Sequence, residues 1–353
     1  MIEKSNASVT VDLSSLDNNF RCLSEFVDKD TRIMAVVKSN AYGHGAIKVA
    51  EALEPKVGAF AVNAIQEGIE LREAGITIPI LVFEVPQKSM VRQYRVHNLT
   101  ATFSATEHFD WVPDGTSYHL NFDTGMGRLG FRAEQAEKVA GLVKKRKELF
   151  CTGIYSHFAT AHEPGSARVR EQHRKFNTIR SHFPDQLATH IANTGGTAFY
   201  DTEQFNMVRL GIGLYGYAPG DIAIDGLQPV LRWDTFLTQV KEVKKGEAIS
   251  YGADWQAPSD GYIGILPVGY EDGLKRNLGG KLRVLIGNED YPVVGTVTMN
   301  YTMVFLEQSK FEVGTAVKLL HAGNNAYDWA QKLETIPYEI LTSIDLRIPR
   351  TYI

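Results

Sequence analysis

The chain has 353 residues, of which 44% are hydrophobic, enough for a large core and two domains. Its 37 basic and 41 acidic residues give a net charge of −4, which argues against a nucleic acid partner. No apolar run approaches the ~20 residues of a membrane span, and residues 1–6 lack the apolar core of a signal peptide, so we expect a cytoplasmic protein without a membrane partner. The two cysteines, Cys22 and Cys151, form no metal-binding or disulfide motif, and we expect no metal site.

Eight short apolar segments follow one another through the first two thirds of the chain and predict β-strands. They span residues 33–38, 59–63, 80–83, 101–104, 119–123, 152–157, 190–194 and 207–211. Amphipathic stretches such as 133–148 and 167–182 separate most of them and predict helices. Eight strands joined by helical crossovers predict an α/β fold, a (β/α)8 barrel over residues 1–229, with a doubly wound sheet as the structural alternative.

The pattern changes after a loop near residues 217–226. Short β-rich segments separated by Gly or Asn turns follow, at 237–243, 261–267, 281–286, 290–297, 301–305 and 316–320. They predict a C-terminal, mostly-β domain over residues 230–353. An opening strand within residues 1–13 precedes the barrel and is a candidate for pairing with that second domain.

Lys38 ends the first predicted barrel strand and is followed at once by a polar, glycine-bearing turn. Burying an ammonium group costs free energy unless the group is paired or neutralised. Parallel barrels carry their active sites at this end of the strands. A lysine whose pKa is lowered there suits Schiff-base chemistry with an aldehyde cofactor. The plainer alternative is a lysine that ends a strand and reaches water.

Four further barrel strands end on side chains that bind anions or transfer protons. Arg128 projects from a loop with three glycines in six residues, and a guanidinium fits a carboxylate or an aromatic oxygen. Asn193 and Thr194 precede a predicted helix, where a hydroxyl and free amides form an anion cradle. Arg209 lies on a strand that looks buried, and a buried arginine needs a partner or a function. Each of these, like His157, has a structural explanation alone, but five such strand ends together indicate a site.

Three residues of the second domain stand out more weakly. Tyr251 and Tyr270 lie beside glycines, and Met299 follows a predicted strand. Tyrosines beside glycines commonly pack turns, and nothing local identifies either one as catalytic.

Together these segments resemble the bacterial alanine racemases, which are pyridoxal-phosphate enzymes that pair a (β/α)8 barrel with a β domain. The motifs AVVKSNAYGHG at residues 35–45 and SYGA at 250–253 carry the resemblance, which extends from residue 31 to 350. It implies a homodimer that interconverts L- and D-alanine, a small amino-acid substrate, and supplies D-alanine for peptidoglycan.

The resemblance also implies residue roles. Lys38 would hold pyridoxal 5'-phosphate and be the base for the D enantiomer, while Tyr251 of the other subunit would be the base for the L enantiomer. His157 would hydrogen-bond to that tyrosine and Arg209 to His157, because the ordinary pKa of a phenol, about 10, is too high for a base at neutral pH. Arg209 would also face the pyridine nitrogen and weaken the ring as an electron sink. The phosphate would be held by Tyr42, Asn193, Thr194 and the backbone of Gly211 and Ile212. Arg128 would contact the cofactor and the substrate carboxylate, and Met299 would contact that carboxylate too. Tyr270 would lie at the substrate entrance.

Three positions depart from the pattern of the family. Asn121 stands where a carbamylated lysine is common, so Arg128 needs another means of orientation, such as a bound anion. Asn300 stands where aspartate is common, and Leu346 stands where a tyrosine often narrows the pocket. These changes leave the substrate range open, with a serine or broad-specificity racemase as the alternative to an alanine racemase.

Two other functions fit parts of the pattern. A decarboxylase of the same fold would place a glutamate at the pyridine nitrogen and a cysteine in the β domain, so Arg209 and the lack of cysteine after Cys151 favour a racemase. A non-catalytic pyridoxal-phosphate carrier would resemble the barrel alone, and the second domain with Tyr251 speaks against it.

Overall fold

The computed structural model describes residues 4–201 and 203–353, so residues 1–3 of the predicted opening segment and Thr202 lie outside it. The chain divides into two compact units. One spans Leu16–Leu227, and the other joins Gln228–Ile353 to the N-terminal residues up to Ser15. Across the described ranges, no helix is both long and apolar enough to cross a membrane.

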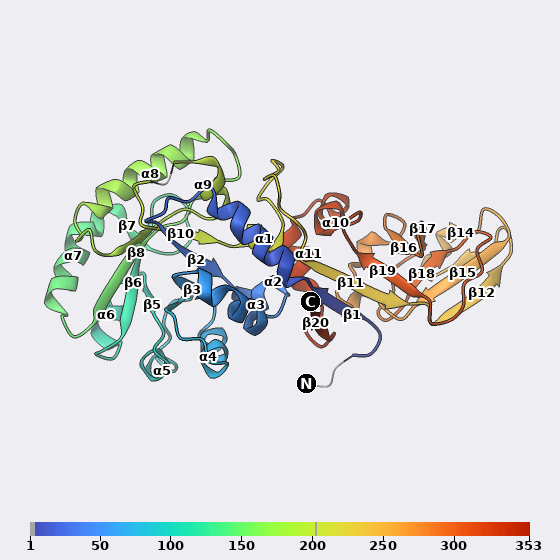
Figure 1. Cartoon of the computed structure of the whole chain (residues 1–353), viewed down its shortest axis with the longest axis horizontal. Helices are drawn as coiled ribbons and strands as arrows, with labels where there is room; N and C mark the ends of the chain where they lie inside the picture. Colours follow the sequence, from blue (N-terminus) through green and yellow to red (C-terminus); the bar gives the residue numbers. More distant parts are fainter. Residues whose placement is uncertain (1–3, 202) are drawn as a thin grey trace. The chain divides into compact units, whose positions relative to one another are not determined.

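Eight parallel strands within the described residues form the core of the first unit (Figure 1). They are β2 (Arg32–Val36), β3 (Ala59–Val62), β4 (Ile80–Val82), β5 (Ala101–Phe103), β6 (Ser117–Asp123), β8 (Phe150–Tyr155), β9 (Ala188–His190) and β10 (Met207–Leu210). Pairing runs β10-β2-β3-β4 and β5-β6-β8-β9, and a bridge between Leu81 and Thr100 links the two ladders. The amide of Arg209 donates to the carbonyl of Ala192 (3.0 Å), which joins the last two strands and closes the ring. The predicted barrel is confirmed, and a doubly wound sheet is excluded.

Helices cover the outside of the barrel strands. They are α1 (Leu13–Ser24), α3 (Ala46–Leu53), α4 (Ile65–Glu73), α5 (Arg92–Val96), α6 (His108–Trp111), α7 (Ala136–Lys145), α8 (Ala167–Arg180) and α9 (Thr194–Phe199). Figure 1 shows α7 and α8 on the outer side of β6 and β8. Because the sheet is covered outside and filled inside, β3, β4, β5 and β10 are buried along their whole lengths, which is why they appear in the sequence as continuous apolar runs.

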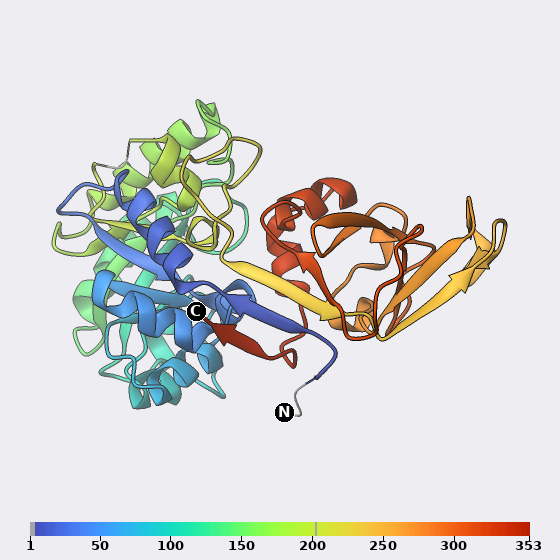
Figure 2. The same cartoon turned by 45° about the vertical axis from the view of Figure 1, so that its right-hand side comes forward.

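A nine-stranded sheet dominates what the structure describes of the second unit, in the order β12-β15-β18-β17-β16-β19-β11-β1-β20. These strands are β1 (Ser8–Val11), β11 (Leu231–Phe236), β12 (Gln239–Val243), β15 (Gly261–Leu266), β16 (Arg283–Ile286), β17 (Glu289–Val294), β18 (Thr302–Phe305), β19 (Ala316–Leu320) and β20 (Arg350–Tyr352). A short hairpin pairs β13 (Ala248–Ile249) with β14 (Trp255–Gln256). The blue N-terminal strand β1 lies antiparallel to β11 and parallel to β20 (Figure 2), so the opening strand belongs to this unit.

Two helices near the C-terminus were not predicted. They are α10 (Ala326–Leu333) and α11 (Pro337–Ser343). On α10 the buried positions Ala326, Trp329 and Ala330 have helical spacing, and Trp329 packs its ring 6.0 Å from that of Trp233. The helices are only 8 and 7 residues long, too short for a periodicity that stands out against the surrounding strands.

Candidate active site

The sequence predicts Lys38 as the last residue of the first barrel strand. The strand β2 instead ends two residues earlier, at Val36. Lys38 is the first residue of α2 (Lys38–Tyr42), and its side chain is half-buried. Burial, and then the positive charges of Arg128 and Arg209, lower the pKa of Lys38 below its usual range. Glu67 opposes this shift only in part. The amine is therefore biased toward its neutral, nucleophilic form.

The turn after Lys38 is left-handed. The backbone of Ser39, Asn40, Ala41 and Tyr42 has φ angles of 54°, 52°, 52° and 53°. Such a conformation costs roughly 1–2 kcal/mol per residue for L-amino acids, so surrounding contacts must hold it. The side-chain carbonyl of Asn40 accepts from the amide of Ala46 (2.8 Å), and the carboxylate of Glu67 accepts from the amide of Ser39. These contacts fix the backbone that carries Lys38.

Tyr42 is brought next to the backbone of Gly211. A Cβ added at Gly211 would lie 2.9 Å from the Tyr42 hydroxyl oxygen, so a larger residue there would have to displace the phenol. The Tyr42 ring lies 4.8 Å from that of Tyr215, whose hydroxyl donates to the carbonyl of Val36 (3.0 Å). The phenol of Tyr42 is thus held between β2 and the segment after β10.

The predicted phosphate residues of the last two strands also come together. Strand β9 ends at His190 rather than at the predicted residue 194, and Thr194 begins α9. The side chain of Asn193 caps α9 by accepting from the amide of Gly196 (3.0 Å). The Thr194 hydroxyl accepts from the amide of Gly211 (3.1 Å), directly before Ile212 begins a 3-10 turn. Tyr42, Thr194 and Gly211 therefore form one small region of hydroxyl and amide groups.

Arg209 lies on β10 with its side chain 2% exposed. It contacts the Nδ1 atoms of His190 (2.7 Å) and His157 (3.0 Å), and it donates to the carbonyl of Ser156 (2.9 Å). Further bonds go to the carbonyls of His190 and Ile191 (3.2 and 3.1 Å). Burial lowers the pKa of Arg209 to about 10, which still leaves the guanidinium charged at neutral pH. In the part of the chain that the structure describes, all the hydrogen bonds of Arg209 go to carbonyl oxygens or imidazole nitrogens, so no carboxylate neutralises this buried charge.

The guanidinium fixes the tautomers of both neighbouring imidazoles. Because a guanidinium can only donate, Nδ1 of His157 and of His190 must accept, which places each ring proton on Nε2. His190 can then donate from Nε2 to Nδ1 of His119, 2.9 Å away. His157 has the same tautomer, so its Nε2–H is a donor on the side of the ring away from Arg209. Burial first, and then Arg209, lower the pKa of His157 and His190 well below the usual range, so both rings are neutral.

Arg128 lies in a loop shaped by Asp123, whose Oδ1 accepts from the amides of Gly125 (2.9 Å) and Gly127 (3.1 Å). A Cβ at Gly130, where φ is +130°, would lie 2.5 Å from the amide nitrogen of Asp123, so glycine is required there. The side chain of Arg128 is exposed, and among residues 4–201 and 203–353 it forms no hydrogen bond or ion pair. Its positive charge is available to an anionic group.

Asn121 has a role of its own in this loop. Its Nδ2 donates to the carbonyl of Leu129 (3.2 Å), so the amide ties the loop to β6 rather than contacting the guanidinium of Arg128. The structure thus shows what the asparagine does at the position where the resemblance leads one to expect a carbamylated lysine.

Three buried residues of the barrel were missed by the sequence analysis. His119 and His190 complete the polar chain around Arg209, and Gln172 on α8 is 1% exposed. The Gln172 amide donates to the carbonyl of His157 (2.8 Å) and accepts from the amide of Ala159 (2.9 Å). Nothing in the sequence distinguishes Gln172 from its solvent-facing neighbours on α8, while His190 lay within a predicted strand and was passed over. No cluster of metal-ligating side chains is formed by the residues that the structure describes.

The site residues predicted in the second unit are all exposed. Tyr251 begins a 3-10 turn (Tyr251–Ala253) and is 73% exposed, and Tyr270 begins another (Tyr270–Asp272). Ser250, with φ at +73°, anchors the first turn by donating from Oγ to the carbonyl of Thr296 (2.8 Å). Met299 lies in the loop between β17 and β18 and is exposed as well. These side chains face outward, as residues that meet a ligand or another subunit would.

The neutral imidazoles make barrel stability depend on pH. Burial lowers the pKa of His119 to about 3, and His157 and His190 shift in the same direction. Below the ordinary pKa of about 6.5, the unfolded chain binds protons that the folded chain refuses, so the free energy of unfolding falls as the pH falls. Each imidazole contributes a slope of about 1.4 kcal/mol per pH unit in that range. His119→Asn, which keeps an acceptor for His190, should reduce the slope between pH 6 and 4.5 by about that amount.

Urea unfolding at closely spaced pH values measures this slope directly. His182→Asn, which removes an imidazole that is exposed after α8, provides the matched control. An unchanged slope in His119→Asn would show that His119 is protonated in the folded barrel.

Comparison with known proteins identifies the family. Residues 11–219 match the model of the alanine racemase N-terminal domain, and residues 230–352 match that of the alanine racemase C-terminal domain. The alanine racemase of Streptococcus mutans is 36% identical, over 97% of this chain and 95% of that protein.

Solved structures agree with this match. An alanine racemase of Clostridium difficile superposes with a TM-score of 0.94 at 30% identity, covering 99% of this chain and 96% of that one. The alanine racemase of Bacillus anthracis with bound L-Ala-P gives a TM-score of 0.91 at 34% identity, covering 99% and 95%. The predicted resemblance is confirmed: the chain belongs to the alanine racemase family, whose members are pyridoxal-phosphate-dependent isomerases.

Proposed function

We propose that this chain is an alanine racemase in which Lys38 and Tyr251 are the two bases, and that it works in the cytoplasm to supply D-alanine for peptidoglycan. The observation that carries the proposal is the half-buried amine of Lys38, whose pKa is lowered by burial and by two nearby arginines. An amine in that state attacks an aldehyde and transfers protons near neutral pH.

The barrel residues fit pyridoxal phosphate in charge and in donor type. Lys38, Arg128 and Arg209 concentrate positive charge, which suits an anionic group. The Tyr42 hydroxyl, the Asn193–Thr194 segment and the amides of Gly211 and Ile212 would hold the phosphate. Bound pyridoxal phosphate supplies an electron sink that makes the substrate Cα–H acidic. The charged Arg209, fixed by neutral acceptors, would keep the pyridine nitrogen unprotonated and limit side reactions.

The two bases would move protons at the substrate Cα atom from opposite faces. The Lys38 amine would take the Cα proton of D-alanine, and the Tyr251 phenolate would take that of L-alanine. In each direction the other residue returns a proton from the far side, which inverts the centre. The Nε2–H of His157, whose tautomer Arg209 fixes, is the donor suited to stabilising a phenolate oxygen. Arg128 and the backbone of Met299 would hold the substrate carboxylate, and Tyr270 would line the entrance.

A homodimer with shared sites would bring Tyr251 of the partner subunit to the barrel. The exposed side chains of Tyr251 and Tyr301, which line one groove of the second unit, support this, because exposed apolar side chains that lie together are typical of an interface. A groove there is lined by Tyr251, Tyr301 and Met303.

Racemisation of purified amino acids tests the function. With pyridoxal phosphate present, L-alanine should convert to an equal mixture of enantiomers, followed by chiral chromatography. We expect alanine to react fastest and serine next, because a small apolar pocket rejects one added hydroxyl poorly, by about 10²-fold at most. Failure to racemise any amino acid, with the cofactor bound, would overturn the proposal.

Subunit mixing tests the shared site. Lys38→Ala protein and Tyr251→Phe protein should each have little activity, but one of the two sites in a mixed dimer carries both intact bases. Mixtures that have exchanged subunits should therefore regain about a quarter of wild-type activity, since half the dimers are mixed and each has one working site. Tagged subunits verify the exchange, and no recovery after verified exchange would contradict a shared site.

A further inference from the structure

Three exposed side chains of the second unit stand on short turns and loops. Tyr270, Met299 and Leu346 are 43%, 52% and 53% exposed. Because they are exposed, core packing does not fix their positions. The segments that carry these side chains must therefore be ordered by backbone hydrogen bonds and by contacts between polar side chains.

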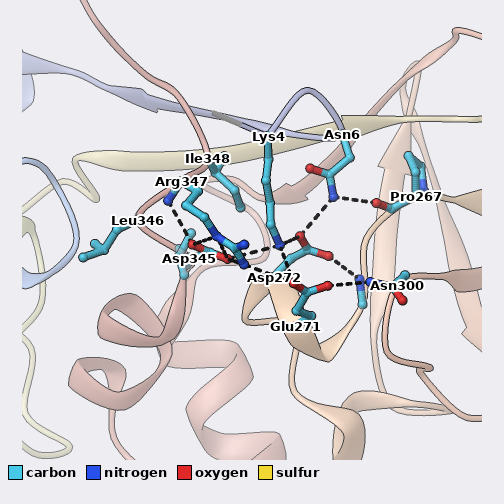
Figure 3. A network of polar contacts seen from close by, with 12 residues as sticks. Lys4, Asn6, Pro267, Glu271, Asp272, Asn300, Asp345, Leu346, Arg347 and Ile348 are labelled. Atoms are coloured by element: carbon cyan, nitrogen blue, oxygen red, sulfur yellow. Dashed lines mark hydrogen bonds and ion pairs between the residues drawn. The ribbon is translucent and has the colours of Figure 1, made fainter. Parts of the chain in front are cut away.

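Backbone hydrogen bonds already join these segments. The amides of Tyr270 and Glu271 donate to the carbonyls of Thr298 (3.0 Å) and Met299 (3.1 Å). The amide of Asp345 donates to the carbonyl of Asp272 (3.0 Å). A polar cluster, called here the entrance cluster, links the same segments through side chains (Figure 3). It consists of Lys4, Glu271, Asp272, Asn300, Asp345 and Arg347.

Lys4 joins three carboxylates from two separate segments. Its Nζ lies 2.7 Å from Asp272, 3.1 Å from Asp345 and 3.5 Å from Glu271. Burial opposes the charged form of Lys4, but the hydrogen bonds to Asp272 and Asp345 outweigh it and raise its pKa. The N-terminal segment thereby ties the Tyr270 turn to the segment that carries Leu346.

Arg347 forms the second cationic link. Its guanidinium binds Asp345 through Nε (3.1 and 3.0 Å) and reaches Glu271 through Nη2 (3.1 Å). The hydrogen bond to Arg347 is the main reason that the pKa of Asp345 lies well below its usual range. Within the entrance cluster, three carboxylates pair with the two cations Lys4 and Arg347. A further carboxylate there would therefore be repelled.

Asn300 connects the Met299 loop to this cluster. Its Nδ2 donates to Oε2 of Glu271 over 2.6 Å, while Oε1 of Glu271 faces Arg347. An aspartate at this position would bring a fourth carboxylate against Glu271. The amide at position 300 is therefore matched to the glutamate at 271.

We propose that the entrance cluster positions Tyr270, Met299 and Leu346 relative to one another, and so sets how readily small amino acids enter the site. The proposal rests on the proposed function, in which Tyr270 lines the entrance and the backbone of Met299 holds the substrate carboxylate, while Leu346 stands where a tyrosine often narrows the pocket. The members of the entrance cluster are positioning residues that transfer no proton. Changes in the cluster should therefore act on KM more than on kcat.

The test is a double-mutant cycle between positions 271 and 300 in the pyridoxal-phosphate-loaded protein. Asn300→Asp should raise KM for L-alanine about fivefold through carboxylate repulsion, with kcat within about twofold of wild type. Adding Glu271→Gln places an amide donor opposite the new carboxylate and keeps an oxygen for Arg347. The double variant should therefore return KM to within about twofold of wild type. Lys244→Met, which breaks an exposed pair with Asp260 elsewhere in the unit, should leave KM unchanged.

Hydrogen exchange provides a readout that does not depend on activity. Peptides that contain Tyr270 and Met299 should exchange faster in Asn300→Asp and return to wild-type protection in the double variant. Additive effects of the two substitutions on KM, or unchanged exchange and KM in Asn300→Asp, would overturn the positioning role. A wild-type protein that racemises nothing would instead overturn the proposed function, and the role in substrate entry would fail with it.

Discussion

Replacing Lys38 with alanine is expected to abolish the covalent attachment of pyridoxal phosphate and to lower kcat for alanine racemisation by about 10³-fold or more. The expectation follows from the local structure. Burial and the charges of Arg128 and Arg209 hold the pKa of Lys38 low, and the left-handed turn over residues 39–42 fixes its backbone. Removing the amine removes both the attachment point and the proposed base for D-alanine.

Borohydride reduction followed by peptide mapping measures the attachment. In the wild-type protein the reduced cofactor should be recovered on Lys38 alone. Lys48→Ala, which changes an exposed lysine of α3, should keep the yellow colour of the bound cofactor and full racemase activity. Recovery of the label on a different lysine would show that the wrong amine has been assigned.

The barrel could be predicted because its strands are buried on both sides. In β3, β4 and β10 every residue is buried, so the apolar runs in the sequence coincide with the strands to within one residue at each end. The ends of the strands were harder to place. Lys38 follows β2 by two residues, because the chain leaves the ladder at Val36 while the apolar run continues to Val37, and His157 follows the end of β8 by two residues. The left-handed turn after Lys38 could not be predicted, since Ser, Ala and Tyr disfavour that conformation and the single Asn40 does not indicate four consecutive residues in it.

Contacts between distant residues explain most of what the sequence analysis missed. His119 and His190 are 71 positions apart and meet only because β6 and β9 lie in one closed ring. Lys4 and Asp272 are 268 positions apart and meet because β1 joins the second unit. In the sequence, Glu271, Asp345 and Arg347 look like ordinary surface charges. Only the distances between their charged atoms show that they form one cluster beside Tyr270.

Replacing Tyr251 with phenylalanine should lower kcat for racemisation by about 10²- to 10⁴-fold, the range for loss of a general acid–base group. Phenylalanine keeps the ring and removes only the hydroxyl, so the exposed turn over Tyr251–Ala253 should keep its shape. The loss should be unequal for the two enantiomers. Exchange of the D-alanine Cα proton with solvent, which needs only Lys38, should persist better than exchange of the L-alanine proton.

Proton NMR of each enantiomer in deuterated water measures the two exchange rates separately. Tyr262→Phe, a change of another tyrosine in the second unit, provides a control with the same chemistry and should leave both rates unaltered. Absorbance of the bound cofactor shows whether Tyr251→Phe still binds it, which separates a lost base from a lost site. Equal loss of both exchange rates with the cofactor bound would contradict the two-base assignment, because a single group would then serve both faces of the substrate.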